Sequence, residues 1–189
     1  MSTPGAALTY EAFGPSFFEH AVTEERILSV LDELLGTAIE VGPIGVGPGR
    51  LVKASATGRY GLPEITRTST RPLEYRVTVP ASLTFTLDLQ VETQKFNADL
   101  LVPLVLRATA AEPLLVVIEV IPPDASKLTV KVRAEGLRAT VVQKVADVDH
   151  ELRRFLAKYV ARELTKPYVE DARTIDVAAL MDRAWTSRG

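Results

Sequence analysis

Apolar and polar residues alternate through the middle of the chain, from residue 73 to residue 134. Residues 83–92 alternate without a break, as Leu-Thr-Phe-Thr-Leu-Asp-Leu-Gln-Val-Glu. A period of two places the apolar side chains on one face of a strand and the polar side chains on the other. The same period returns in residues 96–106, 114–120 and 128–134. This pattern predicts about four long strands.

The breaks between these strands are short, at residues 92–95, 110–113 and 122–126. Connections of a few residues join antiparallel neighbours, so we expect a meander. Residues 100–106 and 114–121 are apolar at odd as well as even positions. A helix, a partner subunit or an apolar ligand should therefore cover the second face of the sheet. The odd apolar positions are Leu101, Val105, Leu115, Val117 and Ile121.

Two segments outside the strands have clear helix boundaries. Thr23 can cap the N-terminus of a first helix, and Gly36 ends it. Glu24 and Glu25 lie in its first turn, where the helix dipole favours negative charge. Asp176 can cap a last short helix near the end of the chain.

A longer helix is predicted between residue 140 and about residue 164. Its apolar residues recur at spacings of three and four, which is the period of one helix face, and Pro167 ends it. The stripe consists of Val141, Val145, Val148, Leu152, Phe155, Tyr159 and Val160.

The first fifteen residues are expected to be loose at their start. Three phenylalanines at the end of this segment and just beyond it, Phe13, Phe17 and Phe18, are concentrated enough to indicate that it docks onto the core.

Three stretches between the first helix and the central strands give weaker signals. Residues 37–41 and 51–56 are candidate strands. The glycine- and proline-rich residues 42–49 between them lack the Walker spacing and its Lys-Ser/Thr pair, so a plain turn is predicted. Residues 61–72 are predicted to form a polar connector.

Together the elements predict an α+β fold. A long, curved antiparallel sheet, a meander, would wrap around a long C-terminal helix, with one further helix near the N-terminus. Residues 1–22 would form an N-terminal segment, residues 23–166 a single α+β domain, and residues 167–189 a short helix and tail packed on the same domain. A chain of 189 residues is long enough to bury one sizeable core.

Composition narrows the class of protein. The 22 basic and 24 acidic residues give a net charge of -2, so no nucleic acid partner is expected. Cysteine is absent, which excludes disulfides and thiolate metal sites. No basic residue precedes an apolar run at the N-terminus, and no apolar run reaches the roughly 18 residues of a membrane span. We expect a soluble, cytoplasmic protein without an integral membrane segment. Transient contact with a membrane is compatible with these features.

Few residues suggest chemistry. His150 and Asp147 share a helix face, but such a pair is more typical of a solvated surface contact than of a metal site. Asp99, Arg107 and Glu119 are charges within apolar strands. They either meet a ligand head group or a paired charge, or face water at strand ends. No catalytic arrangement, metal site or cofactor is predicted, and the protein is not expected to be an enzyme.

The order of a helix, long antiparallel strands and a long helix with an apolar stripe resembles the tubular lipid-binding (TULIP) superfamily. This superfamily includes the bacterial permeability-increasing protein and synaptotagmin-like lipid-transfer domains. The resemblance covers about residues 23–164 and includes the doubly apolar strands between Leu100 and Ile121. It implies a curved sheet that wraps a long helix and leaves an apolar tube for a lipid chain. The chain is short for a full tubular module.

A second fold is compatible with the same elements. In the START-like helix-grip fold, a long C-terminal helix closes an antiparallel sheet over a hydrophobic cavity. That fold usually places a strand before its first helices, and no convincing strand precedes Thr23. Both interpretations place an apolar pocket between the sheet and the long helix.

The leading hypothesis is therefore a protein that binds, transports or senses a hydrophobic ligand such as a lipid or fatty acyl chain. A first alternative is an interaction protein whose second apolar sheet face forms a homodimer. A second alternative is a helix-grip ligand-binding protein or enzyme. The predicted lining of the ligand site is Phe85, Leu87, Leu100, Val102, Leu104, Leu106, Val116, Ile118, Phe155 and Tyr159.

Overall fold

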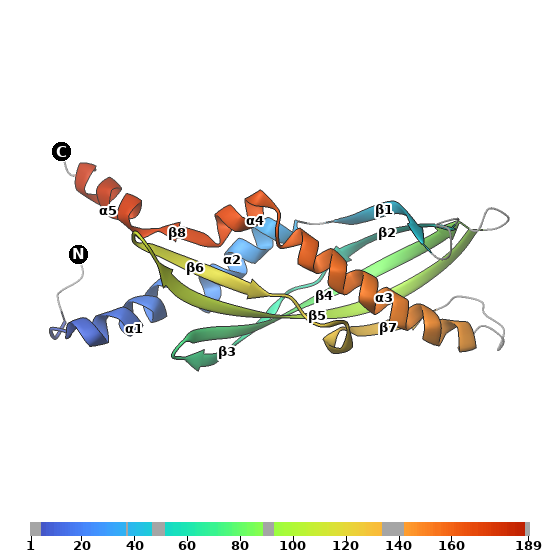
Figure 1. The fold of residues 1–189 in the computed structure, drawn as a ribbon, viewed down its shortest axis with the longest axis horizontal. Helices are drawn as coiled ribbons and strands as arrows, with labels where there is room; N and C mark the ends of the chain where they lie inside the picture. Colours follow the sequence, from blue (N-terminus) through green and yellow to red (C-terminus); the bar gives the residue numbers. More distant parts are fainter. Residues whose placement is uncertain (1–4, 37, 47–51, 89–92, 134–141, 188–189) are drawn as a thin grey trace.

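The computed structural model describes residues 5–36, 38–46, 52–88, 93–133 and 142–187. These residues form an eight-stranded antiparallel sheet that curls strongly, with several helices packed on it (Figure 1). The α+β class and the long antiparallel strands predicted from the alternation are confirmed.

Two long strands form the centre of the sheet. β4 (Leu73–Asp88) has 16 residues and β5 (Thr93–Ala111) has 19. They pair along the whole of β4, from Leu73 opposite Ala108 to Asp88 opposite Thr93. In this register the apolar positions of both strands share one face, which we call the inner face.

Two shorter strands lie end to end along each side of this central pair. β2 (Val52–Tyr60) and β3 (Glu64–Thr70) both pair with β4. β6 (Leu115–Ile121) and β7 (Thr129–Arg133) both pair with β5. The predicted meander is therefore wrong at its last step, because β7 does not pair with β6 but returns to β5.

The proline of each central strand lies where one flanking strand ends and the next begins. The amide of Gly61 donates to the carbonyl of Pro80 at 2.8 Å, so the backbone polar groups of Pro80 point into the gap between β2 and β3. Pro80 lies opposite Leu101, and Pro103 is two residues further along β5. Because hydrogen-bonded pairs alternate, Pro103 points into the gap between β6 and β7. Neither missing N–H interrupts the β4–β5 ladder.

Strands occupy two stretches that were predicted to be connections. The polar residues 61–72 contain β3, which pairs with β4 from Glu64 opposite Thr78. β1 (Ile39–Val46) pairs with β2 and continues through Gly42 and Pro43, with an irregular register there. Edge strands expose much of their surface, so they need no apolar alternation, and pairing with a neighbour decides their structure. Residues 47–49 of the predicted turn lie outside the described residues.

The N-terminal helices are only partly as predicted. α2 (Glu24–Leu35) begins after Thr23, whose hydroxyl accepts from the Arg26 amide at 3.4 Å, and ends at Gly36, with φ of 62°. Both boundaries agree with the sequence prediction. α1 (Tyr10–Ala21) is an additional helix, which begins within the first fifteen residues and extends to Ala21.

Three helices and one strand follow in the described residues 142–187. α3 (Val142–Glu163) is the longest helix, with 22 residues. α4 (Pro167–Ala172) and strand β8 (Thr174–Asp176), which pairs with β6, separate it from α5 (Val177–Thr186). The helix predicted from residue 140 to about residue 164 corresponds to α3, whereas the last described helix, α5, has 10 residues. Asp176 caps α5 as predicted, accepting from the Ala179 amide at 2.9 Å.

The inner face of the sheet carries two core clusters. Tyr60 and Val102 pack against both of them. In the part of the chain that the structure describes, no polar or charged residue is buried. The first core cluster consists of Ile39, Ala56, Ala81, Leu83, Phe85, Phe96, Ala98, Leu100, Leu128, Val130 and Leu156. The second core cluster consists of Val22, Ile27, Leu73, Tyr75, Val77, Val79, Leu104, Leu106, Ala108 and Val116.

The close approach of β2 to β4 generates a first prediction. A Cβ atom added to Gly58 would lie 2.6 Å from Leu83 Cδ2 and would clash with the Ser82 carbonyl oxygen. We expect Gly58→Ala to lower the free energy of unfolding by about 3 kcal/mol, measured by urea denaturation.

Gly14→Ala is the matched control. Gly14 lies within α1, and an added Cβ would meet no atom within 4 Å. Because alanine has a higher helix propensity than glycine, Gly14→Ala should raise the free energy of unfolding by about 1 kcal/mol. Equal stability of Gly58→Ala and the wild-type protein would contradict the close approach.

Candidate functional site

Part of the predicted lining lies in the first core cluster. Phe85 and Leu100 are buried there, on β4 and β5. Phe155 of α3 is half-buried and packs against them, and Tyr159, one turn further along α3, is also half-buried. The side chain of Leu87 lies outside the described residues.

The rest of the predicted lining lies in or beside the second core cluster. Leu104, Leu106 and Val116 are buried in it, and Ile118 packs against it. Val102 packs against both clusters and joins the two groups. The predicted residues therefore follow the inner face along β5, but they belong to two packed groups.

α3 is attached to the sheet at the edge formed by β7. Its backbone comes close to β7 and to the short helix η2 (Ala125–Lys127) that precedes this strand. The Arg153 guanidinium donates to the carbonyl of Leu128 at 2.8 Å, and Leu156 is buried in the first core cluster. These contacts place the apolar side of α3 against the inner face.

An aromatic and charged group follows at the C-terminal end of α3. The rings of Phe155 and Tyr159 are stacked, with centroids 6.2 Å apart. The guanidinium carbon of Arg162 lies 5.6 Å from the centroid of the Tyr159 ring, within the range of a cation–π contact. On this side of the helix the ring of Phe155 is therefore followed by the cation of Arg162 within two turns.

The connection to α4 adds further members of this group. Lys166 Nζ lies 2.5 Å from Glu163 Oε2 and 5.9 Å from the centroid of the Tyr168 ring. Tyr60, at the end of β2, interacts electrostatically with Glu163 and Tyr168. We call these residues the tyrosine cluster: Tyr60, Tyr159, Arg162, Glu163, Lys166 and Tyr168.

The environment of Tyr60 favours its neutral form. Burial raises the pKa of Tyr60 to about 12, and Tyr159, Glu163 and Tyr168 add to the increase because their negative charge would repel a tyrosinate. Burial also raises the pKa of Tyr159. Both hydroxyls therefore remain hydrogen-bond donors at neutral pH.

Sequence reasoning found only Tyr159 of this cluster. Arg162 and Lys166 follow it at spacings of three and four, which indicates one helix face, but such a pattern is typical of any solvated helix surface. Tyr60 lies near these residues because β2 ends beside them, and no local pattern in the sequence predicts this proximity.

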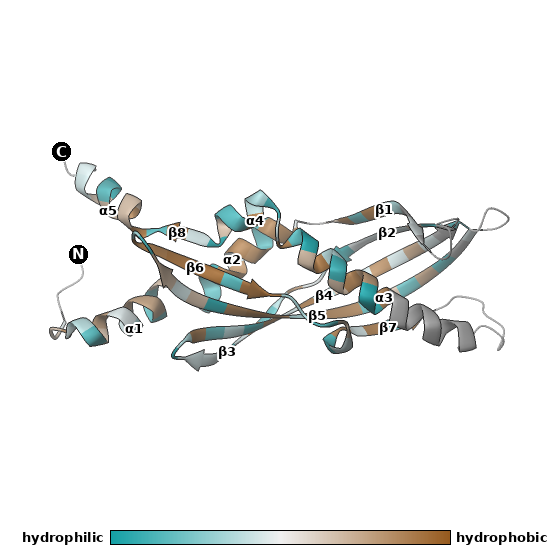
Figure 2. Ribbon diagram, viewed as in Figure 1, coloured by the Kyte–Doolittle hydropathy of each residue, from teal (hydrophilic) through white to brown (hydrophobic). Residues whose placement is uncertain are grey.

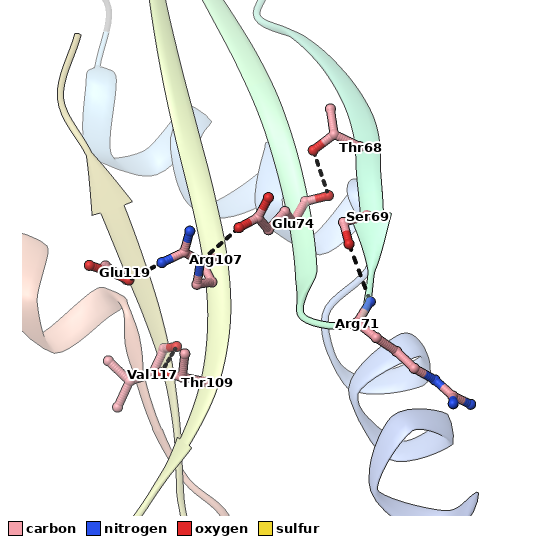
Figure 3. A network of polar contacts seen from close by, with 8 residues as sticks. All are labelled: Thr68, Ser69, Arg71, Glu74, Arg107, Thr109, Val117 and Glu119. Carbon is pink, nitrogen blue, oxygen red and sulfur yellow. Dashed lines mark hydrogen bonds and ion pairs between the residues drawn. The ribbon is translucent and has the colours of Figure 1, made fainter. Parts of the chain in front are cut away.

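The outer face of the sheet carries a polar network (Figure 3). Arg107 Nε donates to Glu74 Oε1 at 2.7 Å, and a guanidinium nitrogen of Arg107 lies 3.6 Å from Glu119 Oε2. The hydrogen bond and the charge of Glu74 raise the pKa of Arg107. Because the neighbours Leu106 and Ala108 are buried, Arg107 points away from both core clusters.

Asp99 also lies on the outer face, where the Ser82 hydroxyl donates to its carboxylate at 3.2 Å. A depression of about 370 Å³ opens beside them, and Arg59 and Lys131 contribute to its lining. Charged outer-face side chains line the depression together with apolar residues such as Pro80 and Leu101, so it does not correspond to the predicted apolar tube.

The remaining chemical candidates give no site. His20 Nδ1 lies 2.7 Å from the Ser16 carbonyl oxygen in the same helix. The side chains of His150 and Asp147 lie outside the described residues. Within the described ranges, no three His, Cys, Asp or Glu residues are grouped as metal ligands. None of the described helices has the length and apolar character required to cross a membrane.

Comparison with known proteins adds no family to this picture. The chain matches no protein-family model, and no curated protein is significantly similar to it.

The pKa of Tyr60 generates a second prediction. Because the pKa is higher in the folded protein than its ordinary value of 10.0, stability from this group is complete below pH 10.0 and is lost as the pH rises towards about 12. We expect Tyr60→Phe to flatten this decrease, measured as the free energy of unfolding at increasing alkaline pH.

Tyr10→Phe serves as its control, because Tyr10 is 99% exposed. This variant should show the same pH dependence as the wild-type protein. An unchanged decrease in Tyr60→Phe would show that Tyr60 does not cause it.

Proposed function

We propose that the chain binds a hydrophobic ligand, such as a lipid or fatty acyl chain, between the inner face of the sheet and α3, for transport or sensing. One observation carries this proposal: Phe155 and Tyr159 of α3 are half-buried beside an inner face whose buried side chains are apolar among the described residues, apart from the Tyr75 hydroxyl, which is paired with the Val22 carbonyl. A surface of this kind suits an apolar chain and offers few hydrogen-bond partners to a polar ligand.

The partial burial of the boundary residues supports the proposal. Val102 and Ile118 on the sheet, like Phe155 on the helix, keep some exposed apolar surface. A ligand lying along them would remove this surface from water. Each buried CH₂ group contributes about 0.8 kcal/mol, so an acyl chain of about ten such groups gains enough to offset the cost of association.

The arrangement also agrees with what the resemblance to the tubular lipid-binding superfamily implies. A strongly curled antiparallel sheet and a 22-residue helix, α3, are both present (Figure 1). We propose that the sheet partly wraps α3, with the ligand lying along the helix from Phe155 towards the second core cluster.

The third prediction tests this site with Val102→Asp. Val102 packs against both core clusters, so a carboxylate there would place a charge in the path of the ligand. We expect at least a tenfold loss of affinity for a fluorescent fatty acid, measured by titration. Mass spectrometry of an organic-solvent extract should find a lipid in the wild-type protein and less of it in the variant.

Val105→Asp provides the matched control on the other face of the same strand. Val105 lies opposite Arg76 in the β4–β5 register, so the added carboxylate has a cation beside it. Its affinity should equal that of the wild-type protein. Unchanged binding by a folded Val102→Asp variant, checked by circular dichroism, would refute the proposed lining.

The outer face favours a second candidate function, self-association. Leu101 on this face is 43% exposed, and Val105, Val117 and Ile121 are half-buried. Figure 2 shows β6 as apolar along most of its length. Because side chains alternate along a strand, apolar residues of β6 lie on both faces of the sheet. A second copy of the chain would cover this apolar surface.

The fourth prediction distinguishes this candidate. If the outer face forms a homodimer, light scattering should give twice the monomer mass for the wild-type protein, and Leu101→Lys should shift the equilibrium to the monomer. Leu62→Lys is a control, because Leu62 is 88% exposed and lies between β2 and β3. A wild-type monomer at high protein concentration would eliminate self-association.

A further inference from the structure

The tyrosine cluster occupies a junction between apolar and polar parts of the molecule. Tyr60 packs against both core clusters, and Tyr159 stacks on Phe155, which packs against the first. The side chain of Arg162 on the next turn is exposed. An elongated ligand that follows Phe155 along α3 would therefore reach Tyr159 and Arg162 where it meets solvent.

The hydroxyl groups in this cluster differ from that of Tyr75. The Tyr75 hydroxyl donates to the Val22 carbonyl at 2.6 Å, where it holds the segment between α1 and α2. Among the described residues, no hydrogen bond is found for the hydroxyl of Tyr60 or Tyr159. Both hydroxyls are protonated at neutral pH and are therefore available as donors to an incoming acceptor.

The charges of the cluster favour an anion. Lys166 is paired with Glu163, and these two charges cancel. Arg162 contacts the Tyr159 ring and has no carboxylate partner in the described part of the chain. Two cations and one carboxylate leave a net charge of +1. An arginine beside tyrosine hydroxyls supplies charge-assisted and neutral hydrogen bonds to a carboxylate or phosphate.

We infer that Arg162, with Tyr60 and Tyr159, binds the anionic head group, a carboxylate or a phosphate, of an amphipathic ligand whose apolar chain lies along α3. This inference rests on the proposed function and adds the chemical class of the ligand. It also gives the ligand a direction, with its head at the end of α3 near α4 and its chain towards the middle of the helix.

The experiment compares three ligands that share one apolar chain: dodecanoic acid, dodecyl phosphate and dodecanol. Their affinities are measured by displacement of the neutral dye Nile red from the full chain. The wild-type protein should bind the acid or the phosphate at least tenfold more tightly than the alcohol, because a charged hydrogen bond is present only with the anions. The tighter of the two anions identifies the head group.

Arg162→Gln should reduce this preference about tenfold and leave the affinity for dodecanol unchanged. Tyr60→Phe keeps the ring and should reduce the preference by a smaller factor. Arg154→Gln is the matched control, because Arg154 is exposed on the same helix about 12 Å away along its axis. It should bind all three ligands like the wild-type protein.

Other outcomes overturn the inference in distinguishable ways. Equal wild-type affinity for the three ligands would refute the head-group site and leave the apolar site intact. An equal loss for all three ligands in Arg162→Gln would assign Arg162 a purely structural role. If the wild-type protein binds none of the three, both the head-group site and the proposed function fail.

Discussion

The antiparallel pairing of β4 with β5 is the constraint on which the rest of the structure depends. It joins Leu73 to Ala108 at one end and Asp88 to Thr93 at the other, without a shift in register. A slip by one residue would bring the apolar set of one strand against the polar set of the other. The long runs of apolar residues on both strands make that slip costly. Every other strand except β1 and β8 pairs directly with one of these two.

This central pair also explains why the inner face is divided into two clusters. Pro80 and Pro103 point away from the shared ladder and lie between the flanking strands, so each side of the pair is formed by two short strands. Tyr60 and Val102 lie near this division and pack against both clusters. α1 and α2 contribute to the second cluster, whereas α3 contributes Leu156 to the first. α3 also reaches the second half, because its Val160 packs against the second core cluster.

The sequence predicted those parts of the fold that local patterns determine. The alternation located β4 and β5, and Thr23, Gly36 and Asp176 located helix ends, because strand faces and helix caps are properties of nearby residues. The sequence did not predict β3, because its polar residues form a strand only by pairing with β4 in the tertiary structure. It also did not predict that β7 pairs with β5. Most of the residues predicted to line the ligand site lie on the inner face. The sequence indicated only Tyr159 of the tyrosine cluster, because Tyr60 comes from a distant part of the chain.

Tyr75, which is buried, and Tyr60, which is half-buried, show how the two halves of the inner face differ. Tyr75 lies in the second core cluster, and its hydroxyl donates a hydrogen bond to the Val22 carbonyl. The half of the inner face that carries this cluster is therefore stabilised by a buried hydrogen bond within the protein. Tyr60 lies at the division, where it interacts electrostatically with Tyr159 and Glu163 of α3. The Tyr60 hydroxyl has no hydrogen-bond partner among the described residues and is not fully buried, so it can donate to a ligand acceptor. The half under α3 is therefore the half better suited to a ligand.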